Sequence, residues 1–215
     1  TTNLGIALAQ IGLKILLVDA DLRKPRLHEI FQISQKPGLS EYLIGKASFE
    51  KIIQATEIPG VWVVTSGTLP KNPAELLGLP AMQQFIKHAT EKFDRVLLDA
   101  PPVIPVTDAV VLSALTGNVL AIASSGKTPR QALYRLMSVV QDVHAKVLGV
   151  ILNNVPTHNI TAYGYGYGVY RYGEPPSTKS VPKGNRLETA FNLVSRLFVE
   201  LKGERSPRRR SVGTD

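Results

Sequence analysis

The stretch "KILLVDADLRKP", residues 14–25, decides the fold. Its four apolar residues, 15–18, are typical of a strand that is buried on both faces, as strands of parallel sheets are. Asp19 and Asp21 follow at the carboxyl end of that strand. Because ligands of open α/β sheets bind at the carboxyl ends of the strands, the stretch predicts a ligand-binding edge that carries two aspartates.

The sequence on either side alternates between strand-like and helix-like segments. Strands are expected at 15–19, 61–65, 95–99, 118–123 and 146–152, and helices at 4–12, around 25–32 and 39–44, within 73–92, and at about 107–115 and 128–143. Such alternation is typical of βαβ units. We therefore expect an α/β fold with a mostly parallel sheet and helices on both faces.

Composition limits the classes of protein that remain. The chain has 215 residues, 44% of them hydrophobic, which suffices for one core and an appendage. It contains no cysteine, which excludes disulfides and thiolate metal sites. The longest apolar runs are only as long as strands, so no membrane span is expected.

The composition changes after Asn153, where Gly, Tyr and Pro replace the apolar pattern. We expect a catalytic-type domain at 1–156, a flexible Tyr/Gly/Pro-rich segment at 157–183, an amphipathic helix at 184–203 and a basic disordered tail at 204–215. One apolar stripe marks the helix: Leu187, Phe191, Val194, Phe198 and Leu201. We expect this helix to pack on the domain or on a neighbouring subunit, with a membrane surface as the alternative.

The net charge of +8 is concentrated near the end of the chain. Residues 1–150 carry 15 Lys and Arg against 12 Asp and Glu, whereas residues 151–215 carry 10 against 5. The simplest interpretation is a solvated terminus. Attraction to an anionic membrane surface or to nucleic acid is the alternative.

A second strand ends on an acidic residue in "RVLLDAPPV", residues 95–103. If Asp99 reaches the same edge as Asp19 and Asp21, three carboxylates lie close together, which is costly without a cation. Mg²⁺ with phosphate oxygens suits such an all-oxygen site. The alternative is that these aspartates only cap the helices that follow.

Six segments of the sequence together resemble one family. They are "ILLVDADLRKPRLHEIF" (15–31), "SGTLPKNPAELL" (66–77), "VLLDAPPV" (96–103), "VTDAVVL" (106–112), "GKTPRQAL" (126–133) and "GVILNNV" (149–155). The chain resembles the cytoplasmic catalytic domain of bacterial tyrosine kinases, the P-loop autokinases of capsular and exopolysaccharide synthesis. Ala100 departs from the Thr or Ser that the family carries in its Walker B motif. The resemblance implies a P-loop NTPase-like fold.

The resemblance also implies roles for individual residues. Asp19 and Asp99 would hold Mg²⁺, and Asp21 would lie near the incoming tyrosine hydroxyl. Arg23 would stabilise phosphate or the neighbouring loop, and Asn153 would contact the adenine of ATP. The implied cofactors are ATP and Mg²⁺, and the implied activity is that of a non-specific protein-tyrosine kinase.

A tyrosine cluster supplies the implied phosphoacceptors: Tyr163, Tyr165, Tyr167, Tyr170 and Tyr172. Glycine between tyrosines suits a flexible strip that enters a neighbour's active site. The implied partner is therefore a second copy of the chain, in a ring-like homo-oligomer that autophosphorylates in trans, with a tyrosine phosphatase to reverse it. The alternative is a low-complexity linker without a catalytic role.

One motif of the family is missing from the sequence. No G-x-x-x-x-G-K-[ST] loop occurs, since Gly126-Lys127-Thr128 lacks the earlier glycine. We expect this chain to bind ATP poorly, because that loop holds the phosphates. The resemblance implies that the parent protein carries the loop just before Thr1, and a membrane-embedded chain-length regulator or activator upstream or on another chain. The protein would then lie in the cytoplasm, at the inner face of the bacterial plasma membrane.

Two other functions remain open. One is a partition or division-site ATPase that binds DNA or membrane through the basic tail. The other is a catalytically silent adaptor of the same fold. The Arg-Lys-Pro, the Asp-Ala-Pro-Pro and the tyrosine cluster favour the kinase, for which no nucleic-acid partner is expected.

Overall fold

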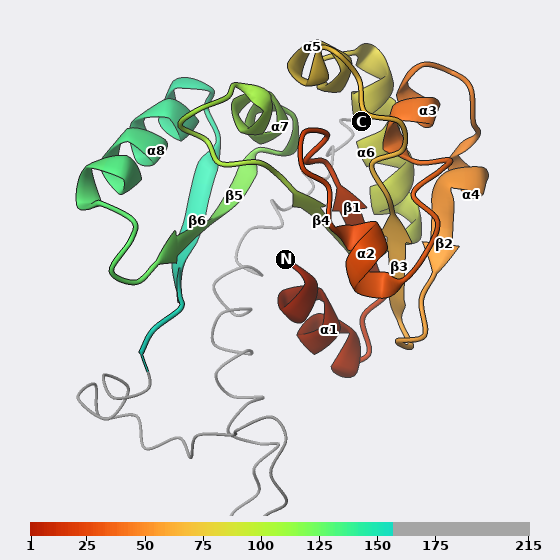
Figure 1. The fold of residues 1–215 in the computed structure, drawn as a ribbon, viewed down its shortest axis with the longest axis horizontal. Coiled ribbons are helices and arrows are strands. Elements are labelled where there is room, and N and C mark those ends of the chain that lie inside the picture. The colour runs from red at the N-terminus through yellow and green to blue at the C-terminus, as the bar shows by residue number, and fades with distance from the viewer. Residues whose placement is uncertain (157–215) are drawn as a thin grey trace, which may run out of the picture. The chain divides into compact units, whose positions relative to one another are not determined.

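The computed structural model describes residues 1–156 (Figure 1). The predicted tyrosine segment 157–183, helix 184–203 and tail 204–215 lie outside the described residues. The helices are α1 (Thr2–Gln10), α2 (Leu27–Phe31), α3 (Leu39–Leu43), α4 (Phe49–Ile52), α5 (Pro73–Leu77), α6 (Pro80–Lys92), α7 (Asp108–Thr116) and α8 (Arg130–Asp142). The strands are β1 (Ile15–Asp19), β2 (Ile53–Ala55), β3 (Val61–Val64), β4 (Arg95–Asp99), β5 (Asn118–Ser124) and β6 (Lys146–Asn153).

The strands of the described residues form two sheets. The larger has the order β2-β3-β1-β4, in which β1 runs parallel to both neighbours and β2 runs antiparallel to β3. The smaller sheet pairs β5 with β6 in parallel, and α7 and α8 pack against it (Figure 1). The predicted α/β class and the mostly parallel pairing are confirmed.

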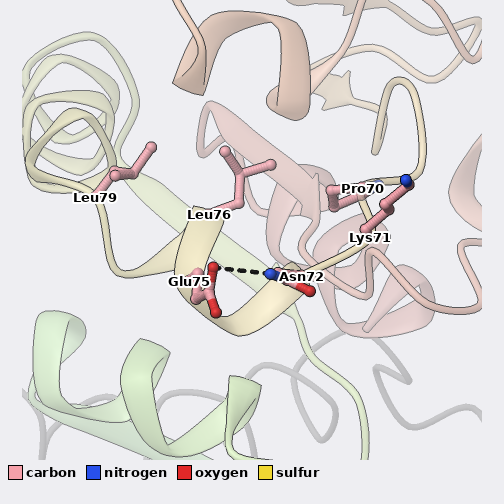
Figure 2. A pocket seen from close by; sticks show the side chains of 6 residues that line it. All are labelled: Pro70, Lys71, Asn72, Glu75, Leu76 and Leu79. Carbon is pink, nitrogen blue, oxygen red and sulfur yellow. Dashed lines mark hydrogen bonds between the residues drawn. The ribbon is translucent and has the colours of Figure 1, made fainter.

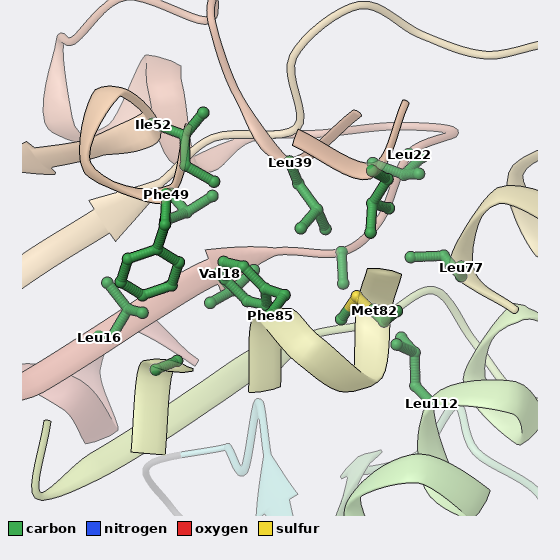
Figure 3. Packing of buried hydrophobic residues seen from close by; sticks show 14 residues of the cluster. Leu16, Val18, Leu22, Leu39, Phe49, Ile52, Leu77, Met82, Phe85 and Leu112 are labelled. Carbon is green, nitrogen blue, oxygen red and sulfur yellow. The ribbon is translucent and has the colours of Figure 1, made fainter. Parts of the chain in front are cut away.

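The main hydrophobic core lies on one face of the larger sheet (Figure 3). Leu16 and Val18 point from β1 into this core, as the period of two along a strand requires. Residues of helices α3 to α7 cover them: Leu39, Leu43, Phe49, Ile52, Leu77, Met82, Phe85, Ala89 and Leu112. All of these side chains are at most 5% exposed, so they hold the sheet and its helices as one packed unit.

Helix α1 covers the opposite face of β1. Gly5 lies so close to Leu17 that a Cβ on the glycine would be 2.6 Å from a Leu17 methyl carbon. A methyl group at Gly5 would therefore require the Leu17 side chain to shift where the helix crosses the strand. With α1 on one face and the core helices on the other, helices cover both faces of the larger sheet, as predicted.

Two local features differ from the sequence prediction. Helix α4 and strand β2 were not predicted, because an isolated four-residue helix and three-residue strand carry too little periodicity. The helices predicted within 73–92 are confirmed as α5 and α6, which Gly78 and Leu79 separate. Leu79 is extended (φ −65°, ψ 148°) because it precedes Pro80, which starts α6 at its first position.

No helix within residues 1–156 combines the length and apolarity that crossing a membrane requires.

Candidate active site

Asp19 and Asp99 are opposite each other in the register of β1 and β4. Each is the last residue of its strand, and the pairing continues one step further through a hydrogen bond from the Ala20 N–H to the Asp99 carbonyl oxygen (2.9 Å). The four residues before Asp19 are fully buried, which fixes the strand and therefore the position of the carboxylate. The parallel pairing thus brings both predicted metal ligands to one edge.

The two carboxylate oxygens of Asp19 have different surroundings. Oδ2 accepts hydrogen bonds from the backbone N–H groups of Arg26 (3.0 Å) and Leu27 (2.9 Å) at the start of α2. Oδ1 is buried and has no hydrogen-bond partner. The helix-capping alternative therefore describes one oxygen of Asp19, while the other is left for a ligand, since buried polar atoms are rarely unpaired.

The electrostatics of Asp19 follow from this geometry. Burial raises the pKa of Asp19 from 3.8 to about 6. The hydrogen bonds from Leu27 and Arg26 oppose that increase, whereas the nearby carboxylates of Asp99 and Asp21 add to it. A cation at Oδ1 would reverse the balance by favouring the charged form.

The donor set fits Mg²⁺ with part of its coordination supplied from elsewhere. Within the described residues, no three His, Cys, Asp or Glu side chains converge well enough to hold a metal alone. Mg²⁺ characteristically uses one or two carboxylates and fills its octahedron with water and phosphate oxygens. The unpaired Oδ1 of Asp19, with Asp99 as its register partner, matches that requirement.

Asp21 and Arg23 lie on the loop that follows β1. The Asp21 Oδ1 atom accepts hydrogen bonds from the backbone N–H groups of Arg23 (3.1 Å) and Lys24 (2.9 Å). The Arg23 guanidinium forms two hydrogen bonds with Asp108, from Nε to Oδ2 (2.8 Å) and from Nη2 to Oδ1 (2.9 Å). Arg23 therefore contacts the start of α7, in the part of the chain that follows β4. Its expected role of stabilising phosphate or the neighbouring loop stays a prediction.

Sequence reasoning did not select Asp108 as a site residue. It is fully buried at the first position of α7, where its carboxylate meets Arg23. In the sequence, Thr107-Asp108 precedes an apolar helix and resembles an ordinary helix start. A partner 85 residues away in sequence leaves no local pattern, so only the fold brings the pair together.

Asn153 is the last residue of β6, in the smaller sheet. It is exposed, its carbonyl oxygen accepts a hydrogen bond from the Ser125 N–H (2.8 Å), and its side-chain oxygen accepts one from the Asn154 N–H (2.9 Å). The aspartates belong to the other sheet, so Asn153 is not joined to them by strand pairing. Its expected contact with adenine stays a prediction.

A shallow pocket is formed by the loop before α5, by α5 itself and by Leu79 (Figure 2). It is lined by Pro70, Lys71, Asn72, Glu75, Leu76 and Leu79. An Asn72 side-chain hydrogen bond to Glu75 (2.9 Å) ties the loop before α5 to that helix. None of Asp19, Asp21 and Asp99 lines this pocket, so it is not where the carboxylates would act.

Comparisons with known proteins show the family to which the chain belongs. The AAA domain family model matches residues 1–153. The chain is 37% identical over 166 residues to the tyrosine-protein kinase YwqD of Bacillus subtilis, which covers 77% of this chain and 70% of that protein. The chain belongs to the bacterial tyrosine-protein kinases. The resemblance inferred from the sequence motifs is therefore confirmed.

Two further comparisons define how far the likeness extends. The chain is 41% identical over 155 residues to the tyrosine-protein kinase ptk of Acinetobacter johnsonii, but it spans only 21% of the length of that relative. The solved kinase domain of the Escherichia coli tyrosine kinase ETK superposes with a TM-score of 0.70 at 34% identity, over 80% of this chain and 65% of that domain. The chain therefore shares its fold with a solved tyrosine-kinase domain, and Asp19 and Asp99 lie on strands of that fold.

Proposed function

We propose that the protein is an ATP-dependent protein-tyrosine autokinase that regulates capsular or exopolysaccharide synthesis and export. The observation that carries this proposal is the register pair of Asp19 and Asp99 at one sheet edge, together with the unpaired buried Oδ1 atom of Asp19. Mg²⁺, bound together with a nucleotide phosphate, would supply the positive charge that these carboxylates require.

Phosphoryl transfer requires positioning and charge neutralisation more than covalent chemistry by the protein. Mg²⁺ would supply neutralisation of the phosphate charge when it is bound. Asp19 and Asp99 would hold the metal directly or through water, and Asp21 would orient the acceptor tyrosine hydroxyl or accept its proton. The hydrogen bonds from the N–H groups of Arg23 and Lys24 to Asp21 Oδ1 support this proposal, because they limit the movement of the carboxylate.

The proposed acceptors are the five tyrosines of segment 157–183, from Tyr163 to Tyr172. Each phosphate would add a charge of about −1.5 to −2. Trans autophosphorylation in a ring of copies would therefore build up repulsion between neighbours and favour disassembly. We place the protein in the cytoplasm at the inner face of the plasma membrane, with a membrane-embedded activator and a tyrosine phosphatase as its other partners.

Phosphopeptide mapping tests the proposal directly. The protein as encoded in full, with any residues ahead of Thr1, is incubated with Mg-ATP, and residues 159–179 are analysed by mass spectrometry. The Asp99→Asn variant removes a proposed metal ligand at little steric cost. Asp142→Asn makes the same chemical change at the exposed end of α8 and serves as the matched control.

Phosphate on several of the five tyrosines, lost in Asp99→Asn and retained in Asp142→Asn, is the expected result. ATP hydrolysis without tyrosine modification would overturn the proposal in favour of a partition-type ATPase. Absence of both activities would instead favour a catalytically silent adaptor.

A further inference from the structure

The side chain of Asp108 is fully buried, and both of its carboxylate oxygens bind one guanidinium. Arg23 reaches it from the loop after β1, and the Arg23 side chain remains 41% exposed. Paired hydrogen bonds between a guanidinium and a carboxylate fix direction as well as distance, because the planar fork matches the two oxygens. Asp108 therefore determines where Arg23 lies.

Arg23 belongs to the short segment that orients both aspartates of β1 and its loop. The backbone N–H groups of Arg23 and Lys24 hold Asp21, while those of Arg26 and Leu27 hold Asp19. All four hydrogen bonds are between 2.9 and 3.1 Å long. A displacement of residues 23–27 would thus move the donors of both carboxylates together.

Asp108 lies on the segment that follows the other acid-bearing strand. The chain runs from Asp99 at the end of β4 through residues 100–107 to the start of α7, where Asp108 is the first residue. The contact between Arg23 and Asp108 therefore connects the segment after β1 to the segment after β4. The strands themselves are joined where Asp19 pairs with Asp99, so β1 and β4 are connected both at their ends and through the segments that follow them.

We propose that Asp108 is a positioning residue which, through Arg23, holds segment 23–27 and thereby orients Asp19 and Asp21 for the reaction. The effect on phosphoryl transfer rests on the proposed kinase function, whereas the effect of Asp108 on the orientation of segment 23–27 does not depend on that function. A merely structural ion pair would stabilise the fold without affecting the geometry of the two aspartates in the folded protein.

The first test measures the geometry without any catalysis. Backbone amide hydrogen exchange is followed by NMR in the chain of 215 residues, for the wild type and for Asp108→Asn. We expect the N–H groups of Arg23, Lys24, Arg26 and Leu27 to exchange at least about tenfold faster in the variant, while those of β1 are unchanged. Asp142→Asn, at the exposed end of α8, should alter neither set.

Two outcomes of that test would overturn the proposal. Exchange of the four loop amides at the wild-type rate would show that Asp108 does not hold the segment. Equal acceleration of the loop amides and of the β1 amides would show that the pair only stabilises the fold as a whole.

The second test measures the reaction in the protein as encoded in full. At a temperature well below unfolding, Asp108→Asn should lower kcat for tyrosine phosphorylation at least about tenfold, whereas the Asp142→Asn control should not. If Asp108 acts through Arg23, adding Asp108→Asn to Arg23→Gln should lower kcat no further than Arg23→Gln does alone. A further loss of kcat in the double variant would overturn the positioning role.

The two tests separate the inference from the proposed function. A wild-type protein that phosphorylates no tyrosine would refute the kinase proposal. The hydrogen-exchange result would still decide whether Asp108 orients segment 23–27.

Discussion

The carboxylates of Asp19 and Asp99 end two adjacent parallel strands in register, and one oxygen of the buried Asp19 lacks a hydrogen bond. Such an arrangement is unfavourable in the absence of a cation, because burial and a neighbouring like charge both oppose ionisation. The residues that form the candidate site should therefore reduce the stability of the metal-free protein.

Replacing Asp19 by Asn should stabilise the metal-free protein at about pH 7.5. Burial raises the pKa of Asp19 from 3.8 to about 6, so the folded state binds more protons than the unfolded state between these values. The contribution of Asp19 to stability is thus full below pH 3.8 and is lost as the pH rises through about 6. Asparagine carries no charge at any pH, so its advantage should be about 1–3 kcal/mol at neutral pH and should shrink in acid.

Thermal unfolding of Asp19→Asn between about pH 4 and pH 8, without Mg²⁺, measures this effect. Asp142→Asn is the matched control and should show no pH-dependent gain. A melting temperature of Asp19→Asn that lies below the wild type at neutral pH would contradict the explanation.

The sequence predicted those parts of the site that depend on local pattern. A buried strand followed by an acidic residue is visible in "ILLVD" and again in "RVLLD", and the rule for parallel sheets places both ends at one edge. The family motifs added expected roles for Asp21 and Arg23, and these roles stay predictions. The fold class followed from the alternation of strand-like and helix-like segments.

Other parts of the site depend on contacts that no local pattern contains. The unpaired oxygen of Asp19 depends on where α2 places the N–H groups of Arg26 and Leu27. The contact of Arg23 with Asp108 joins residues 85 positions apart, and strand β2 exists only because β3 pairs with it. Each of these features is decided by tertiary structure, which overrides weak local preference.

Gly38 should be intolerant of even a methyl group. A Cβ at this position would overlap the backbone N of Gly67 and the carbonyl oxygen of Thr65, neither of which can move as a flexible side chain could. We expect Gly38→Ala to lower the free energy of unfolding by about 3 kcal/mol. Urea unfolding of the variant measures the loss.

Gly45→Ala is the comparison for that variant. Gly45 has a φ of +74° and open space around its Cβ position, so alanine there should cost only about 1 kcal/mol of backbone strain. A loss in Gly38→Ala no larger than in Gly45→Ala would mean that the two loops can separate without cost.

Phe85 should be among the most sensitive core positions. It is fully buried in the same core cluster as Phe49 (Figure 3). The centroid of its ring lies 5.5 Å from that of Tyr42 and 5.6 Å from that of Phe49. Phe85→Ala should cost about 3–5 kcal/mol, because it removes both the buried area and the ring contacts. Tyr134→Ala, at a side chain that is 71% exposed, should stay within about 0.5 kcal/mol of the wild type in the same unfolding experiment.

The contribution of Glu41 to stability should depend on pH in the direction opposite to that of Asp19. Its Oε2 atom accepts a hydrogen bond from the Gly38 N–H (2.8 Å), and its Oε1 atom accepts one from the Thr68 N–H (3.0 Å). Partial burial acts to raise the pKa of Glu41, but the hydrogen bonds from Thr68 and Gly38 outweigh burial and lower it below 4.5.

A lowered pKa means that the unfolded state binds more protons, so the contribution of Glu41 is present above pH 4.5 and is lost as the pH falls through the lowered value. Glu41→Gln has one acceptor oxygen and one NH2 donor, so one of the two N–H groups loses its acceptor, and the change should cost about 1–2 kcal/mol at neutral pH. Thermal unfolding should show that this difference narrows below about pH 4.5, while the exposed Glu57→Gln control follows the wild type throughout. A difference that is unchanged in acid would mean that the Glu41→Gln substitution disturbs packing, since lost packing does not depend on protonation of the wild-type carboxylate.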